Sequence, residues 1–145
     1  MHRLLLTAFL LTAFGCTSQD EVARVKSPDG KVDAVLFETN GGATNSFGYE
    51  VFITPPGAGT WRGKEVADLY GAVRSENAYG VNLTWTSNDE LAIEFLKSRQ
   101  QDLMKPTVDL MSKRIKVTLK AGVTDSKAPS GGMLYNLKQV GGVLN

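Results

Sequence analysis

The chain has 145 residues, of which 42% are hydrophobic and 21% charged, a size and composition typical of one folded domain rather than a disordered chain. Its formal net charge is +1. A nearly neutral domain has no overall field that attracts a phosphate polymer, so we expect no nucleic-acid partner.

The N-terminus has the pattern of a secretion signal. Arg3 precedes an apolar run over residues 4–14, and the small residue Gly15 follows it. This run is shorter than the roughly 20 apolar residues that a membrane-spanning helix needs. We therefore predict that residues 1–15 are a signal peptide, which leaves 15 basic and 15 acidic residues in the mature chain once Arg3 is removed.

The end of this segment resembles the lipobox of bacterial lipoproteins, in which a small residue precedes an acylated cysteine. Gly15 and Cys16 fit that pattern, whereas Ala13 replaces its usual leucine and Phe14 is bulky for its place. Cys16 is the only cysteine of the chain, so an internal disulfide is excluded. The resemblance implies a palmitate-type lipid anchor on Cys16. Because Thr17 is not aspartate, the resemblance also implies that the protein is anchored in the outer membrane of the bacterial envelope and faces the periplasm.

We interpret residues 16–20 as a polar tether and residues 21–122 as a β domain. Ser27-Pro28-Asp29-Gly30 is a turn signal that joins strand-like residues 21–26 and 31–38 into a hairpin. Polar and apolar residues then alternate with the period of a strand over residues 48–54, 81–86, 91–95 and 113–120.

The turn Ser87-Asn88-Asp89-Glu90 predicts a second hairpin between residues 81–86 and 91–95. Residues 65–74 fit either a strand or a short helix, and residues 97–104 fit a helical turn or a loop. Together the elements predict an all-β fold, either a small antiparallel β-sandwich or a strongly bent sheet built from hairpins.

Residues 123–145 show a weaker pattern. Residues 126–132 are rich in Ser, Pro and Gly, which is typical of a linker. The residues that follow contain one glycine pair and little charge, so we expect a loose C-terminal tail or one added strand.

Part of the chain resembles a group of small bacterial envelope proteins. The shared features are the Ser-Pro-Asp-Gly-Lys hairpin at residues 27–31, the strand Ala34-Val35-Leu36-Phe37-Glu38 and the loop Gly42-Ala43-Thr44. The resemblance covers about a quarter of the chain, mainly residues 27–53. It implies no activity.

The residue types that remain after cleavage exclude much chemistry. The only histidine is His2, within the predicted signal, and Cys16 is the predicted lipid attachment site. The mature domain then has no imidazole and no free thiol for a Ser-His-Asp or Cys-His arrangement, for His/Cys zinc or copper sites, for haem ligation by His or for an iron–sulfur cluster. We expect no catalytic residues, no metal and no cofactor.

Two surfaces are candidates for binding. The polar loop at residues 40–46 offers the side chains of Asn40, Thr44, Asn45 and Ser46, unless it is a simple connector. Trp61 beside Arg62 follows a Pro-Gly loop and has the composition of a binding hot spot, unless the indole folds back over the sheet. We expect Trp85 in the core.

The basic residues Arg114, Lys116 and Lys120 share one strand face. They either touch acidic lipid or a partner, or protect an edge strand from aggregation. We therefore expect a lipid-anchored, non-catalytic module that binds another envelope protein or a cell-wall component. The alternative is a carboxylate-dependent hydrolase of envelope polymers, since carboxylates are the acid–base groups that remain.

Overall fold

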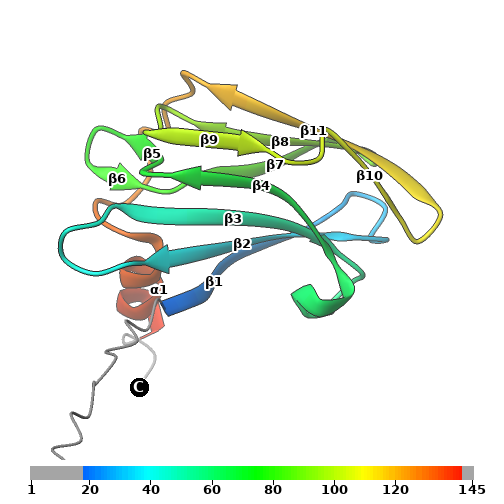
Figure 1. Cartoon of the computed structure of the whole chain (residues 1–145), viewed down its shortest axis with the longest axis horizontal. Helices are drawn as coiled ribbons and strands as arrows, with labels where there is room; N and C mark the ends of the chain where they lie inside the picture. The colour runs from blue at the N-terminus through cyan, green and yellow to red at the C-terminus, as the bar shows by residue number, and fades with distance from the viewer. Residues whose placement is uncertain (1–17, 142–145) are drawn as a thin grey trace, which may run out of the picture.

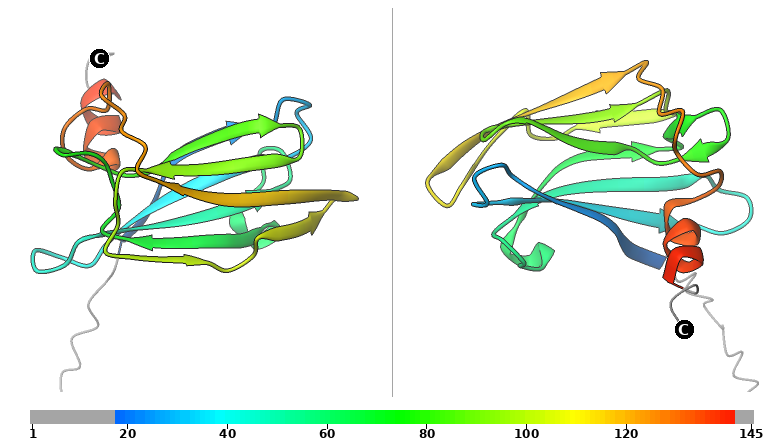
Figure 2. Two further views of the ribbon diagram at one scale, coloured as in Figure 1. Left: turned by 90° about the horizontal axis from the view of Figure 1, so that it is seen from above. Right: turned by 180° about the vertical axis from the view of Figure 1, so that it is seen from behind.

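Two β-sheets face each other in the computed structural model, which describes residues 18–141 (Figures 1 and 2). The first sheet has the order β1 (Ser18–Lys26), β2 (Asp33–Asn40), β3 (Phe47–Thr54), β4 (Lys64–Tyr70) and β9 (Gln100–Leu103). The second has the order β10 (Thr107–Leu110), β11 (Lys113–Ala121), β8 (Glu90–Phe95) and β7 (Asn82–Ser87). The remaining elements are the short hairpin β5 (Val73–Ser75) and β6 (Ala78–Tyr79), the 3-10 helix η1 (Thr60–Arg62) and the helix α1 (Met133–Gly141). The predicted all-β sandwich is confirmed.

Alternation along the strands builds the core between the sheets. In β3 the side chains of Tyr49, Val51 and Ile53 are fully buried, and in the second sheet Ile93 and Ile115 meet them in the same cluster. Burying one face of each sheet against the other removes apolar surface from water, which is the main source of stability for such a fold. Trp85 is half-buried against this cluster, and its Nε1 donates a hydrogen bond of 3.0 Å to the Val25 carbonyl of β1.

Both predicted hairpins are present. Strand β1 pairs antiparallel with β2, and β7 pairs antiparallel with β8. In the first turn the amide of Gly30 donates to the Ser27 carbonyl at 2.8 Å, and Gly30 has a φ of 71° that glycine adopts without strain.

One pairing departs from the predicted antiparallel arrangement, because β11 runs parallel to β8. After β8 the chain adds β9 to the first sheet and then β10 to the second, and it reverses before β11. The two intervening segments therefore carry the chain across both layers before it returns beside β8.

Residues 64–70 form a strand, which is one of the two alternatives predicted for this region. Two other interpretations of the sequence are corrected. Residues 100–103 also form a strand, where a helical turn or a loop was expected. The backbone groups of residues 67–70 pair with those of residues 100–103 in the sheet. This pairing between distant segments cannot be read from the local sequence pattern. Strand β1 begins at Ser18, so part of the predicted tether belongs to the sheet.

Residues 133–141 form a helix, where a loose tail or an added strand was expected. The amides of Tyr79 and Asp125 donate to the carbonyls of Gly131 and Arg74, at 2.9 and 2.8 Å, and helix α1 follows. An isolated helix of this length is marginal in water, so α1 depends on tertiary contacts. It packs beside the start of β1 (Figure 1).

Candidate functional site

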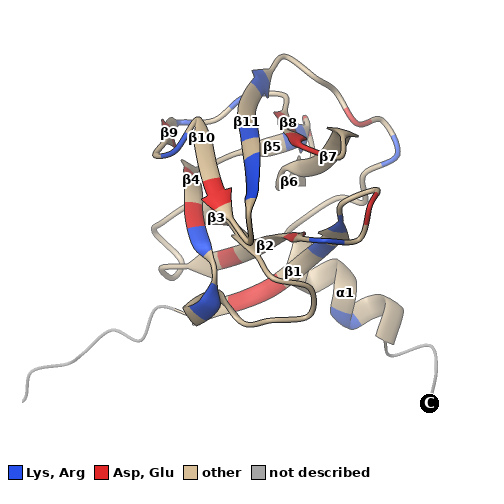
Figure 3. Cartoon of the chain, turned by 90° about the vertical axis from the view of Figure 1, so that its right-hand side faces the viewer, with Lys and Arg blue, Asp and Glu red and all other residues tan. Residues whose placement is uncertain are grey.

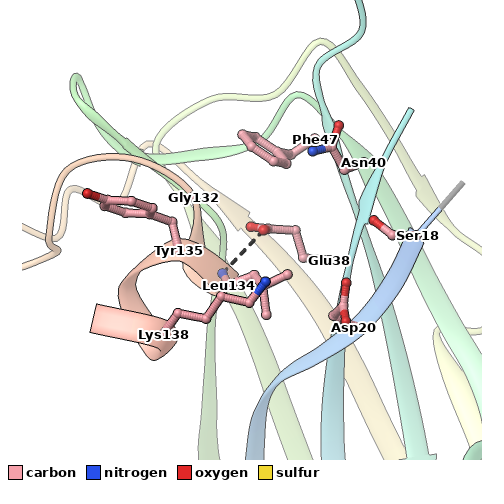
Figure 4. Close-up of a pocket in the computed structure, with 9 residues that line it drawn as sticks. All are labelled: Ser18, Asp20, Glu38, Asn40, Phe47, Gly132, Leu134, Tyr135 and Lys138. Carbon is pink, nitrogen blue, oxygen red and sulfur yellow. Dashed lines mark hydrogen bonds between the residues drawn. The ribbon is translucent and has the colours of Figure 1, made fainter. Parts of the chain in front are cut away.

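A hollow of about 200 Å³ lies between helix α1 and the beginning of the first sheet (Figure 4). Nine residues from β1, β2, β3 and the C-terminal segment line it: Ser18, Asp20, Glu38, Asn40, Phe47, Gly132, Leu134, Tyr135 and Lys138. The hollow thus brings the first described residue of the chain next to its C-terminal helix.

Glu38 is the buried charged group of this region, with 4% of its surface exposed. Its Oε2 accepts hydrogen bonds from the Tyr49 hydroxyl at 2.6 Å and from the Met133 amide at 2.8 Å, and its Oε1 accepts from the Leu134 amide at 3.2 Å. A carboxylate at this place satisfies free amides of the first helical turn and complements the helix dipole. Since both oxygens are engaged, Glu38 holds the helix rather than offering a free acid or base.

Tyr49 is the partner of Glu38 in the core. Burial raises the pKa of the Tyr49 hydroxyl far above its usual range, and the hydrogen bond to Glu38 raises it further. Sequence reasoning did not identify this pair. A signal exists, because Glu38 alternates in phase with the buried residues Ala34 and Leu36 of β2.

The predicted binding loop lies at the same end of the sandwich. Much of its polarity serves the loop itself. Asn40 Oδ1 accepts from the Gly42 amide, and Asn45 Nδ2 donates to the Gly41 carbonyl, both at 2.9 Å. The Ser46 amide donates to the Tyr70 hydroxyl at 2.9 Å.

The Thr44 side chain is exposed and makes none of the side-chain hydrogen bonds found within residues 18–141. Of the four predicted loop residues, it is the one whose polar group is most available to a partner.

Trp61 lies at the opposite end of the first sheet, on η1, with 85% of its surface exposed. The indole therefore does not fold back over the sheet. The Arg62 guanidinium carbon lies 5.6 Å from the centre of the indole ring, within the range of a cation–π contact. Strand β3, about 25 Å long at the usual rise per residue, separates η1 from the 40–46 loop (Figure 1). The predicted binding residues thus form two separate surfaces.

The segment that carries Trp61 is fastened to the sheet. Asp33 Oδ2 accepts from the Gly57 amide at 2.8 Å, and Arg24 donates to the Ala58 carbonyl at 3.2 Å. Arg24 also forms a salt bridge of 3.0 Å with Asp33. A β-carbon added at Gly59 would lie 2.9 Å from Cδ1 of Trp61, so the indole packs closely on the glycine backbone. Trp61 is therefore a projecting aromatic side chain on a well-held support.

Carboxylates form a row on the outer face of the first sheet. Glu50, Asp68 and Asp102 stand directly opposite one another on β3, β4 and β9, beside a hollow of about 290 Å³. Partial burial and the neighbouring charge of Asp102 raise the pKa of Asp68. Partial burial and the charges of Glu50 and Asp68 raise the pKa of Glu65. Like charges that face each other across strands cost stability.

The basic face of β11 is balanced by carboxylates (Figure 3). Arg114 pairs with Asp109 at 2.9 Å, and Lys116 and Lys120 each have a glutamate oxygen at 3.9 Å, from Glu90 and Glu94 respectively. These exposed pairs leave little net positive charge on that face for acidic lipid.

Comparison of the chain with protein-family models, with curated proteins and with solved structures found no match. Within residues 18–141, no helix has the length and apolar content of a membrane span, and no group of three or more His, Cys, Asp or Glu side chains is arranged to hold a metal ion. Cys16 and residues 1–15 lie outside the described residues.

Proposed function

We propose that the chain is a lipid-anchored protein of the bacterial envelope, facing the periplasm, whose β-sandwich binds another envelope protein through Trp61. The observation that carries the binding role is the exposed indole on its fastened segment, next to Arg62. Tryptophan and arginine are enriched among the residues that dominate protein–protein binding energy. A side chain already held in place loses little conformational entropy on binding.

The position of Trp61 in the fold is compatible with a partner in the periplasm. Cys16 is two residues before Ser18, so an extended chain places it within roughly 7 Å of the start of β1. The 3-10 helix η1, which carries Trp61, follows the far end of β3 at the other end of the sheet (Figure 1). An anchor on Cys16 therefore directs Trp61 away from the membrane, toward periplasmic partners.

A protein partner is favoured over a cell-wall glycan because Trp61 and Arg62 project from the surface. A projecting aromatic side chain fits a pocket on another protein, and the adjacent guanidinium adds hydrogen-bond donors. The 40–46 loop, with Thr44 at its exposed part, is the second candidate surface and lies near the anchor.

The experiment compares cross-linked partners of the full-length protein in native membranes, identified by mass spectrometry. We expect Trp61→Ala to lose a protein that the wild type captures. Met111→Ala is the matched control, since Met111 is another exposed apolar residue and belongs to the turn between β10 and β11. Identical captured sets for the wild type and Trp61→Ala would reject the Trp61 surface, and retention on purified cell wall would favour the glycan instead.

One observation favours the alternative, a carboxylate-dependent hydrolase of envelope polymers. Asp68 and Asp102 face each other beside the outer hollow, and the pKa of Asp68 is raised, as expected for a general acid. Turnover of cell-wall fragments by the wild type, abolished in Asp68→Asn, would establish this activity. A Glu94→Gln variant on the other sheet is the control.

A further inference from the structure

Helix α1 and the start of the chain's first strand lie at the same end of the molecule (Figures 1 and 4). Ser18, Tyr135 and Lys138 line one hollow. Since Cys16 is two residues before Ser18, covalent geometry alone keeps it within roughly 7 Å of that strand end. A lipid on Cys16 would therefore bring α1 to the surface of the bilayer.

One side of the outer half of α1 is apolar and exposed. Met133 is buried at the beginning of the helix, whereas Leu137 and Val140 are 47% and 69% exposed. These two residues are three apart and share one side of the helix, where they continue an apolar groove formed with Val22 and Met133. Large apolar side chains that remain exposed together indicate a surface that another apolar phase covers.

The other side of the helix carries polar groups. Tyr135 is exposed on the side of the helix that lines the hollow with Ser18, across the helix from Leu137 and Val140. Lys138 is exposed and forms no salt bridge within residues 18–141. A lysine can bury its aliphatic stem while its ammonium group reaches acidic head groups.

From these observations we infer that helix α1 is a membrane-contact element that rests its Leu137 and Val140 side in the surface of the bilayer. This inference rests on the proposed lipid anchor. The anchor holds α1 close to the membrane, and this high effective concentration allows so small a contact area to bind. The sandwich then stands on the membrane at a defined orientation instead of moving freely on its tether.

The test replaces the acyl anchor, so that its result does not depend on acylation. A chain beginning at Thr17 keeps every residue of the described fold and contains no cysteine, since Cys16 is the only one. An N-terminal histidine tag holds it on vesicles of phosphatidylethanolamine and phosphatidylglycerol (3:1) doped with a nickel-chelating lipid. Val140→Cys receives an environment-sensitive fluorophore, and brominated lipids act as quenchers. Met111→Cys, at the opposite end and 58% exposed, is the matched control.

We expect the probe at residue 140 to shift to shorter wavelength and to be quenched at least twofold more than the probe at residue 111. Adding Leu137→Glu should remove most of this difference, and a circular dichroism spectrum unchanged from that of the parent confirms the fold of each variant. Equal quenching at both positions overturns the inference. Burial of residue 140 without quenching, together with dimers in solution, assigns the apolar side to a second copy and also overturns it. Failure of palmitate to label Cys16 would reject the anchor alone.

Discussion

Glu38 and Met133 are 95 positions apart in the sequence, yet the Glu38 carboxylate accepts a 2.8 Å hydrogen bond from the Met133 amide. The same carboxylate accepts from Leu134 and from the Tyr49 hydroxyl. One buried group in β2 thereby fastens the C-terminal helix to the core.

Replacing this carboxylate should loosen the helix. In Glu38→Gln the side chain keeps its size, but its NH₂ group meets a hydrogen-bond donor where an oxygen stood. One buried donor then loses its partner, and we expect the free energy of unfolding to fall by about 1–3 kcal/mol. Urea denaturation measures the change, and amide exchange at Leu134 reports the helix directly.

Asp20→Asn is the control for this substitution. Asp20 lines the same hollow and makes no side-chain hydrogen bond found within residues 18–141. Its replacement should change stability by no more than about 0.5 kcal/mol. An equal loss in both variants would mean that negative charge in the hollow matters, and not the bonds that Glu38 makes.

A second prediction concerns acid stability at the end that carries Trp61. Lys113 donates to Asp29 at 2.7 Å and to the Asn88 carbonyl at 2.8 Å, which joins the turns of the two predicted hairpins. The hydrogen bonds from Lys113 and then Ser27 lower the pKa of Asp29 from 3.8 to about 2. Burial alone would lower the pKa of Lys113, but the contacts of Lys113 with Asp29 and Asp89 raise this pKa overall.

Because the folded chain holds Asp29 ionised to lower pH than the unfolded chain does, this group stabilises the fold fully above about pH 4. The contribution disappears as the pH falls from about 4 to 2. Asp29→Asn and Lys113→Met should both flatten the dependence of unfolding free energy on pH in that window, as measured by urea titration. Lys120→Met, which removes an exposed pair, should leave the wild-type slope. An unaltered slope in Asp29→Asn would contradict the assignment.

The lipid anchor makes a direct prediction. Radiolabelled palmitate should enter the wild-type chain in bacterial cells and should not enter Cys16→Ser, because Cys16 is the only thiol of the chain. Thr17→Ser is a suitable control, since it alters the neighbouring residue and retains the thiol. Equal labelling of the wild type and Cys16→Ser would end the anchoring proposal.

The 40–46 loop should tolerate substitution. Thr44 and Asn45 are exposed and small, and the hydrogen bond from Asn45 to Gly41 remains within the loop. Thr44→Ala with Asn45→Ala should change the free energy of unfolding by less than about 1 kcal/mol, measured with urea. A clear loss of partner capture at unchanged stability would make this loop the binding surface in place of Trp61. A large loss of stability would show that it braces the hairpins.

Much of the strand pattern was predictable from the sequence, because alternation is a local property. Tyr49, Val51 and Ile53 alternate in β3, and the Ser-Pro-Asp-Gly turn has its own chemistry wherever it occurs. The sandwich follows, since a sheet with one apolar face must bury it. Trp61 was recognisable as a candidate for a related reason, namely that it follows a Pro-Gly loop.

Contacts between distant segments decided the rest. Strand β9 and helix α1 are short, so their form depends on contacts with β4 and with Glu38. The separation of Trp61 from Thr44 by the length of β3 is likewise a property of the folded sheet. The local pattern indicates which face of a strand is apolar. Which strand it pairs with is decided by hydrogen bonds and packing between segments that are far apart in the sequence, so no single stretch of sequence predicts the pairing.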